Sequence, residues 1–285
     1  MHIVFALLSL ILASFNDAVF KVYTSKENSI GAYISLIGVF WGGTFFIVVG
    51  ASSILSMSTT TLLIGLVSGL FSAVANLLLV KGMEKNEASV CSVIYRLNLA
   101  VAAILAFVFL GELITLFKLI GICAAIAAIF IFFAPGSQQG KNRTLYSSGL
   151  LLIVVACFLR ACMGITYKYG LEIGADKYIV LFLNGVTWVI CGGLFHLIQK
   201  YYTPNRVTVT TIKFGAMSGA LVAGIALFMM LALQQGDASV VLPITQLSFL
   251  GTVVIGALML NEKLNIQKTV GLCFGLLCVI AMTVR

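Results

Sequence analysis

Three charged side chains stand deep inside otherwise apolar stretches of the sequence: Asp17, Arg96 and Arg160. Charges are costly in hydrocarbon, where they normally face a protein interior or a wet cavity and mark a path for solutes, ions or protons. Asp17 has two open interpretations. It binds a cationic group or a coupling proton, or it forms an internal salt bridge with Lys21 or with an arginine of another helix.

The two arginines favour a negatively charged ligand. Arginine presents several donors in a planar fork that suits a carboxylate or a phosphate. Two inward arginines against one aspartate leave the interior with a net positive charge, which predicts an anionic or zwitterionic solute. The alternative is that one arginine pairs with Asp17 while the other reaches toward the membrane surface.

Further polar residues are brought near these charges by helical periodicity or by the internal repeat described below. Asn16 adjoins Asp17 in the sequence. Tyr167 shares a helical face with Arg160, and Asn76 ends a polar stripe on its own helix. The predicted substrate-binding residues are Asn16, Asp17, Asn76, Tyr95, Arg96, Arg160, Tyr167, Thr245 and Gln246.

Charged residues at the ends of apolar stretches are expected to form gate or interface contacts rather than to bind substrate. These residues are Lys21, Lys168, Glu112 and Glu262. Trp41 and Trp188 either line the solute path or make packing and lipid contacts, and packing is the favoured interpretation.

Enzymatic chemistry and bound cofactors are not expected. The seven cysteines form no CxxC pair, and the two histidines stand far apart in the sequence, so no metal site is predicted. Asp17 stands nearly alone among the central acids, so a paired-carboxylate site is not predicted either. The sequence also contains no Gly-rich phosphate loop.

The composition decides which elements must position these residues. Of the 285 residues, 61% are hydrophobic and only 9% are charged, and the mean hydropathy is +1.14. A soluble domain carries about 25% charged residues. The apolar runs have roughly the 20 residues that a helix needs to cross a bilayer. We therefore predict an all-α integral membrane protein. Its net charge of +8 is expected to come from Lys and Arg side chains at the membrane surface and does not indicate nucleic-acid binding.

Hydropathy and charged punctuation predict ten transmembrane helices. Their predicted ranges are 3–23, 30–50, 61–81, 88–110, 116–134, 147–169, 178–198, 211–233, 238–260 and 266–284.

An internal repeat relates the two halves of the chain. Residues 60–133 align with residues 210–283 without a gap and match at several Gly, Ser, Glu and Lys positions. The predicted first repeat is 1–135, the linker 136–146 and the second repeat 147–285. Five helices per repeat is an odd number, so the second repeat enters the membrane from the opposite side. Inverted repeats are common in secondary transporters, which bind substrate near the midplane between the repeats.

The repeat and its punctuation resemble the EamA-type, ten-helix branch of the drug/metabolite transporter superfamily. Features that carry the resemblance include Phe20-Lys21 and Tyr167-Lys168, which end the first span of each half. Two others are Ala88-Ser89-Val90 with its counterpart Ala238-Ser239-Val240, and the helix-ending Gly111-Glu112 with Asn261-Glu262. The resemblance implies cytoplasmic termini, whereas the distribution of Lys and Arg over the loops places both termini outside.

The expected function is secondary transport of a small polar metabolite, an amino acid or a related anionic or zwitterionic solute, by alternating access, as an exporter or exchanger. The alternatives are drug or cation efflux by proton antiport through Asp17, an intramembrane enzyme, and a scaffold that transports nothing. The expected setting is the bacterial inner membrane, with the protein a monomer or a homodimer in the lipid bilayer, and no nucleic-acid partner.

Overall fold

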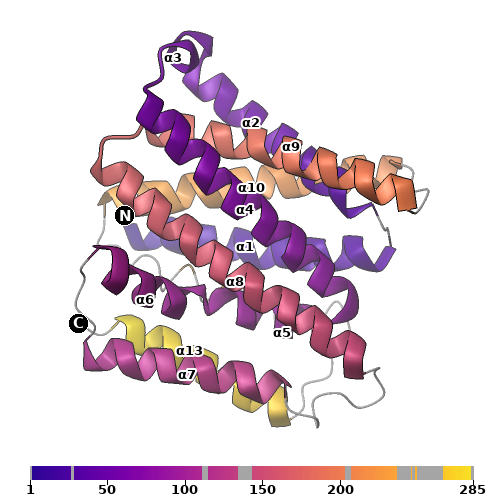
Figure 1. Cartoon of the computed structure of the whole chain (residues 1–285), viewed down its shortest axis with the longest axis vertical. Coiled ribbons are helices and arrows are strands. Elements are labelled where there is room, and N and C mark those ends of the chain that lie inside the picture. Colours follow the sequence, from indigo (N-terminus) through magenta and orange to yellow (C-terminus); the bar gives the residue numbers. More distant parts are fainter. Residues whose placement is uncertain are drawn as a thin grey trace.

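The computed structural model describes residues 2–26, 29–110, 115–133, 143–202, 207–235, 245, 248 and 266–283. These residues form a bundle of helices, as predicted (Figure 1). The helices are α1 (His2–Lys26), α2 (Ile30–Val49), α3 (Ala51–Leu55), α4 (Thr59–Lys85), α5 (Ala88–Arg96), α6 (Asn98–Leu110), α7 (Leu116–Phe133), α8 (Arg143–Glu172), α9 (Lys177–Tyr202), α10 (Val209–Gln235) and α13 (Ile266–Thr283).

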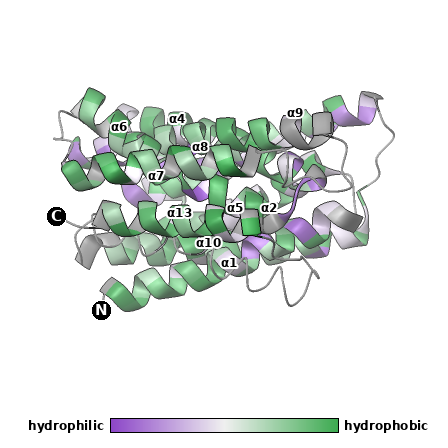
Figure 2. Cartoon of the chain, turned by 90° about the horizontal axis from the view of Figure 1, so that it is seen from below, coloured by the Kyte–Doolittle hydropathy of each residue, from purple (hydrophilic) through white to green (hydrophobic). Residues whose placement is uncertain are grey.

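The outer surface of the bundle is suited to lipid. Within the described residues, seven helices are long and apolar enough to cross a membrane, and two shorter apolar segments lie in α7 and α13. Large apolar side chains are exposed on the outer faces, such as Ile47 at 83%, Phe130 at 72% and Leu197 at 64% (Figure 2). Apolar surface of this extent is not stable in water. The chain is therefore a multi-pass integral membrane protein.

The predicted span 88–110 contains the apolar stretch Val90–Phe109, which is long enough to cross a membrane, but the structure interrupts its helix at Leu97 and so divides it into α5 and α6. The side-chain amide of Asn98 donates to the carbonyl oxygen of Tyr95 at 2.7 Å. Asparagine side chains that bond nearby backbone carbonyls compete with the regular helical ladder. The break lies next to Arg96 and ends the short helix that carries it. The predicted span 238–260 lies outside the described residues, except for Thr245 and Ser248.

Helices from the two halves interdigitate. α2 packs along α9, α1 packs on α10, and α4 packs on both α8 and α9 (Figure 1). The α2–α9 contact requires glycine: a Cβ atom built on Gly38 lies 2.7 Å from the carbonyl oxygen of Gly185 and 2.7 Å from the backbone nitrogen of Val189. Small residues let helix backbones approach closely in lipid, where packing supplies much of the association energy.

The glycine pairs of α4 and α10 also lie at helix contacts. A Cβ atom on Gly65 or Gly69 would meet side chains of α9, and one on Gly215 or Gly219 would meet α2. These four glycines therefore lie where helices pack closely against one another.

Candidate functional site

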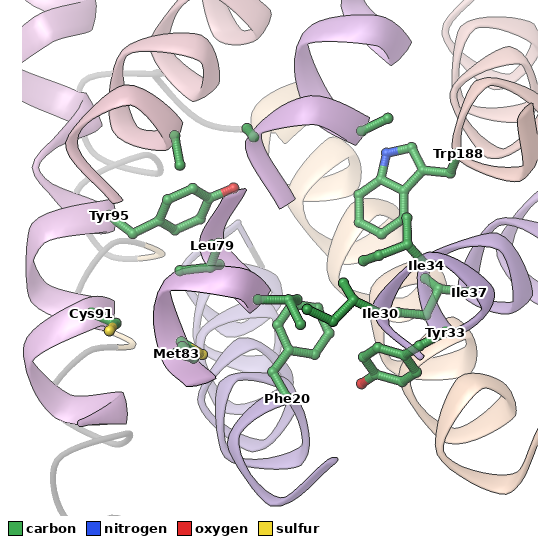
Figure 3. Close-up of a cluster of buried hydrophobic side chains, with 14 of the residues drawn as sticks. Phe20, Ile30, Tyr33, Ile34, Ile37, Leu79, Met83, Cys91, Tyr95 and Trp188 are labelled. Carbon is green, nitrogen blue, oxygen red and sulfur yellow. The ribbon is translucent and has the colours of Figure 1, made fainter. Parts of the chain in front are cut away.

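A central pocket lies among α1, α2, α4, α5, α8, α9 and α10. Its cavity volume is about 60 Å³, measured as the space that the centre of a water molecule can reach. Both halves of the chain contribute to its walls. Tyr95 on α5 and Trp188 on α9 approach the middle of the bundle from opposite sides (Figure 3).

The pocket collects most of the residues that the sequence singled out. Those that line it are Asn16, Asp17, Asn76, Tyr95, Arg96, Arg160 and Tyr167. Thr245 is buried, with 7% of its surface exposed, and is not among the lining residues. Gln246 lies outside the described residues. Lining a pocket is not binding a solute, so the binding role of these residues stays a prediction.

Asp17 is held by two residues of α5. The Arg96 guanidinium lies 3.2 Å from Asp17 Oδ2 and 3.4 Å from Oδ1, and the Ser92 hydroxyl donates to Oδ2 at 2.7 Å. The side chain of Asp17 is 4% exposed and that of Arg96 is 11% exposed, so this ion pair is almost fully removed from solvent. Of the two partner types considered for Asp17, an arginine from another helix is the one found.

Lys21, the other partner considered for Asp17, contacts the end of α4. Its ammonium group donates to the carbonyl oxygens of Met83 and Asn86, both at 2.6 Å, at the end of α4. A cation placed there satisfies carbonyls that have no partner in the last turn of a helix. Lys21 therefore joins α1 to the end of α4, and its predicted gate or interface role stays a prediction.

The other three residues predicted to form gate or interface contacts are Lys168, Glu112 and Glu262. Lys168, on α8, is exposed. Glu112 and Glu262 lie outside the described residues.

Arg160 supplies the pocket with a second positive charge. Its Nη1 contacts the Met163 sulfur at 3.3 Å, and thioethers are weak acceptors. In the part of the chain that the structure describes, Arg160 forms no ion pair. Asp17 and Arg96 compensate each other, so the described residues of the lining carry one positive charge in excess.

Four buried polar atoms on pocket-lining residues have no hydrogen-bond partner among the described residues. They are Trp41 Nε1, Tyr95 Oη, Arg96 Nε and Asn16 Oδ1. A buried polar group without a partner costs about 1–3 kcal/mol. Four such atoms around one cavity indicate that a solute or water completes their bonding. Two of them are donors only, the tyrosine hydroxyl donates or accepts, and the amide oxygen accepts.

The aromatic walls were underestimated from the sequence. Trp41 and Trp188 both line the pocket, with ring centroids 5.4 Å apart and planes at 90°. The indole of Trp188 donates to the Ser72 hydroxyl at 3.1 Å, whereas that of Trp41 has no partner among the described residues. The signal available in the sequence was that the two tryptophans occupy equivalent positions in the two repeats.

Metal chemistry has no support in the described part of the chain, where no three His, Cys, Asp or Glu side chains lie close enough together to hold a metal ion.

Comparisons with known proteins agree with this architecture. Twenty-eight chains of solved structures match. One crystal structure is similar over 98% of this chain and 95% of its own, with a TM-score of 0.65 at 11% sequence identity. At that identity the likeness shows the fold alone. A comparison with curated proteins gave no match.

The sequence itself matches the EamA-like transporter family twice, over residues 1–134 and 147–284. The two matches cover two repeats and nearly the whole chain. The chain therefore belongs to the EamA-like transporter family.

Proposed function

We propose that the protein is a secondary transporter that moves a small anionic or zwitterionic metabolite, such as an amino acid, by alternating access, as an exporter or exchanger. The observation that carries the proposal is the central pocket, which combines an excess positive charge on Arg160 with buried hydrogen-bond donors that have no partner among the described residues.

The charge balance and the donors support an anionic group on the solute. A carboxylate accepts hydrogen bonds only and suits the guanidinium of Arg160 together with Trp41 Nε1. Charge-assisted bonds of this kind are worth about 1.5–3 kcal/mol each. Asn16 Oδ1, which has no partner among the described residues, gives the same pocket an acceptor that suits an ammonium or hydroxyl group on a zwitterionic solute.

The proposed architecture is ten transmembrane helices in two inverted five-helix repeats, and the pairing of helices supports it. α1 and α8 occupy equivalent positions in the repeats, as do α4 and α10. The contact of α1 with α10 is matched by that of α8 with α4, and the contact of α10 with α2 by that of α4 with α9. Such exchange of equivalent contacts between halves is the basis of alternating access in inverted-repeat transporters.

We also propose that the protein resides in a bacterial inner membrane as a monomer or a homodimer. The choice of the bacterial inner membrane is supported by the family resemblance alone.

A second candidate function is efflux of a cationic drug coupled to proton antiport through Asp17. The observation that favours it is a buried carboxylate on the pocket wall whose contacts to Arg96 are as long as 3.2 and 3.4 Å. Protonation of Asp17 or competition by a cation would release Arg96.

The test is a thermal-shift screen of the purified protein against amino acids, organic acids and organic cations. A ligand that binds the folded state raises the unfolding temperature. We expect shifts from anionic or zwitterionic compounds, a loss of the shift in Arg160→Gln and its partial retention in Arg160→Lys. Shifts from cations alone, retained in Arg160→Gln and lost in Asp17→Asn, would instead establish the second candidate.

Flux measurements in liposomes complete the test. A compound that stabilises the protein should also be transported, and Arg160→Gln should abolish its flux. Solute-driven proton movement, followed with a pH-sensitive dye, separates antiport from exchange.

A further inference from the structure

The two ends of the pocket are built from equivalent residues of the two repeats. Phe20 on α1 aligns with Tyr167 on α8, and both line the pocket. Phe20 lies near the end of α4 and Tyr167 near its start, because Tyr167 shares a small cavity with Ile64, while Lys21 bonds to Met83. Ile64 and Met83 are separated by roughly 28 Å along α4 at 1.5 Å per residue. Phe20 and Tyr167 therefore face opposite ends of the bundle.

The end where α1 finishes and α2 begins, the α1–α2 end, is closed by an aromatic seal made of Phe20, Tyr23, Tyr33 and Phe214. Ring centroids are 5.6 Å apart for Phe20–Tyr33, 4.0 Å for Tyr23–Tyr33 and 5.9 Å for Tyr23–Phe214. Phe20, Tyr23 and Tyr33 are at most 1% exposed. Phe20 and Tyr33 project toward one another from α1 and α2 (Figure 3).

Hydrogen bonds fasten this seal at the same end. Tyr33 Oη lies 2.5 Å from the Ser218 hydroxyl, and the Tyr23 hydroxyl donates to the Ser29 carbonyl oxygen at 2.8 Å. Lys21, next to Phe20 in the sequence, ties α1 to the end of α4. Three helices of the two repeats, α1, α2 and α10, are thereby joined at the α1–α2 end.

The equivalent positions at the other end, where α8 finishes and α9 begins, carry smaller side chains. Tyr23 aligns with Gly170, Tyr33 with Val180, and Phe214 with Ile64. Where the seal would be, these three residues line a second cavity together with Tyr167 and Lys177. It contains about 190 Å³ of empty space, of which the centre of a water molecule reaches about 10 Å³. This outer cavity has room for roughly one water molecule.

Tyr167 is the residue that the central pocket and the outer cavity share. We infer that solute reaches the central pocket from the α8–α9 end through the outer cavity, with Tyr167 as a thin gate, while the aromatic seal closes the α1–α2 end. The inference rests on the proposed function insofar as the central pocket is the solute site. The two ends differ because aligned positions of the two repeats carry large aromatic side chains at the α1–α2 end and smaller side chains at the α8–α9 end.

Access to the pocket can be measured without knowing the solute. Ala226 lines the pocket, so Ala226→Cys reports access when membrane vesicles of known orientation are treated with the anionic, membrane-impermeant reagent 2-sulfonatoethyl methanethiosulfonate. Mass spectrometry of the peptide that contains position 226 separates this signal from the native cysteines. Exposed positions 53 and 200, as Ser53→Cys and Lys200→Cys, identify the α8–α9 and α1–α2 ends in the same vesicles.

We expect labelling of position 226 from the α8–α9 end and none from the α1–α2 end. Gly170→Phe fills the outer cavity, since a Cβ atom there already lies 2.5 Å from an Ile64 methyl group, and labelling should be lost. Gly164→Phe on the same helix is the control, because a Cβ atom there has no neighbour within 4 Å, and labelling should persist. Val180→Tyr fills the same cavity if Gly170→Phe does not fold. Tyr33→Val should add labelling from the α1–α2 end.

Labelling of the parent Ala226→Cys protein from the α1–α2 end, or unchanged labelling in the cavity-filling variants, would overturn the path. Failure of the ligand screen leaves these outcomes untouched, because access is measured with the reagent alone. One-sided labelling without any anionic ligand would keep the path and remove the proposed substrate class.

Discussion

Removal of either member of the buried pair Asp17–Arg96 should destabilise the fold strongly, and removal of both should cost less than the two single losses added together. At an effective dielectric constant of about 20, two unit charges at the observed 3.2 Å attract by about 5 kcal/mol. Breaking a buried pair from one side leaves an uncompensated charge and typically costs about 3–5 kcal/mol. Both side chains are nearly fully buried, so little solvent screening reduces this figure.

The variants are Asp17→Asn, Arg96→Gln and the double substitution. Each single variant should lower the free energy of unfolding by about 3–5 kcal/mol, with Asp17→Asn at the low end because its amide oxygen still accepts the Ser92 hydrogen bond. The double variant should be destabilised by less than the sum of the two, because neither charge remains buried alone.

The assay is unfolding of the detergent-solubilised protein by SDS titration, followed by circular dichroism, for all four proteins of the cycle. Additive effects of the two substitutions would show that the pair is not coupled and would refute the reasoning. A double variant that is stable but binds no ligand would place the pair in the solute site as well as in the fold.

Three further changes test the pocket and the packing around it. Trp41→Phe keeps an aromatic ring against Trp188 and removes an indole donor that has no partner among the described residues, so ligand affinity should fall by about 0.5–1.5 kcal/mol while stability is kept. Trp188→Phe breaks the hydrogen bond to Ser72 and should lower the free energy of unfolding by a similar amount. Thermal shifts measured with and without ligand distinguish the two effects. Gly38→Ala forces a Cβ atom against the α9 backbone and should lower the free energy of unfolding in the SDS titration by about 1–3 kcal/mol. Gly43→Ala is the control, because a Cβ atom there meets no neighbour, and it should change this free energy by about 0.5 kcal/mol or less. Equal effects of the two substitutions would contradict the close packing of α2 and α9. Lys21→Met removes the donor to two helix-end carbonyls and should cost roughly 1.5–3 kcal/mol, and an unchanged unfolding curve would exclude this role.

Several pocket residues could be predicted because the membrane makes their chemistry conspicuous. Charges in apolar stretches are conspicuous, as are those of Asp17, Arg96 and Arg160, because a charge in hydrocarbon is costly unless it faces a polar interior. The repeat then directs attention to the same regions of both halves. The pairing of Asp17 with Arg96 rather than Lys21 was beyond the sequence, since Lys21 is the nearer of the two along the chain but bonds to the end of α4 instead.

The residues missed or misjudged share a physical cause. The break at Leu97 is accompanied by a hydrogen bond from the Asn98 amide to the Tyr95 carbonyl oxygen, a contact that hydropathy does not register. Tryptophan occupies both aligned positions, 41 and 188, yet among the described residues the Trp188 indole has an acceptor and the Trp41 indole has none. Hydrogen-bond satisfaction is a property of the assembled bundle.

By itself, the sequence determined that the chain lives in lipid as apolar helices, that its halves are repeats, and that a few charges lie at depth, because each of these follows from composition and alignment alone. Only the tertiary structure decided that Asp17 and Arg96 neutralise each other, that Arg160 is left with a weak acceptor, and that one end of the pocket is sealed by aromatic rings while the other keeps a cavity. Those outcomes depend on which side chains from distant helices meet, and short-range contact between distant parts of a chain is settled only when the helices pack.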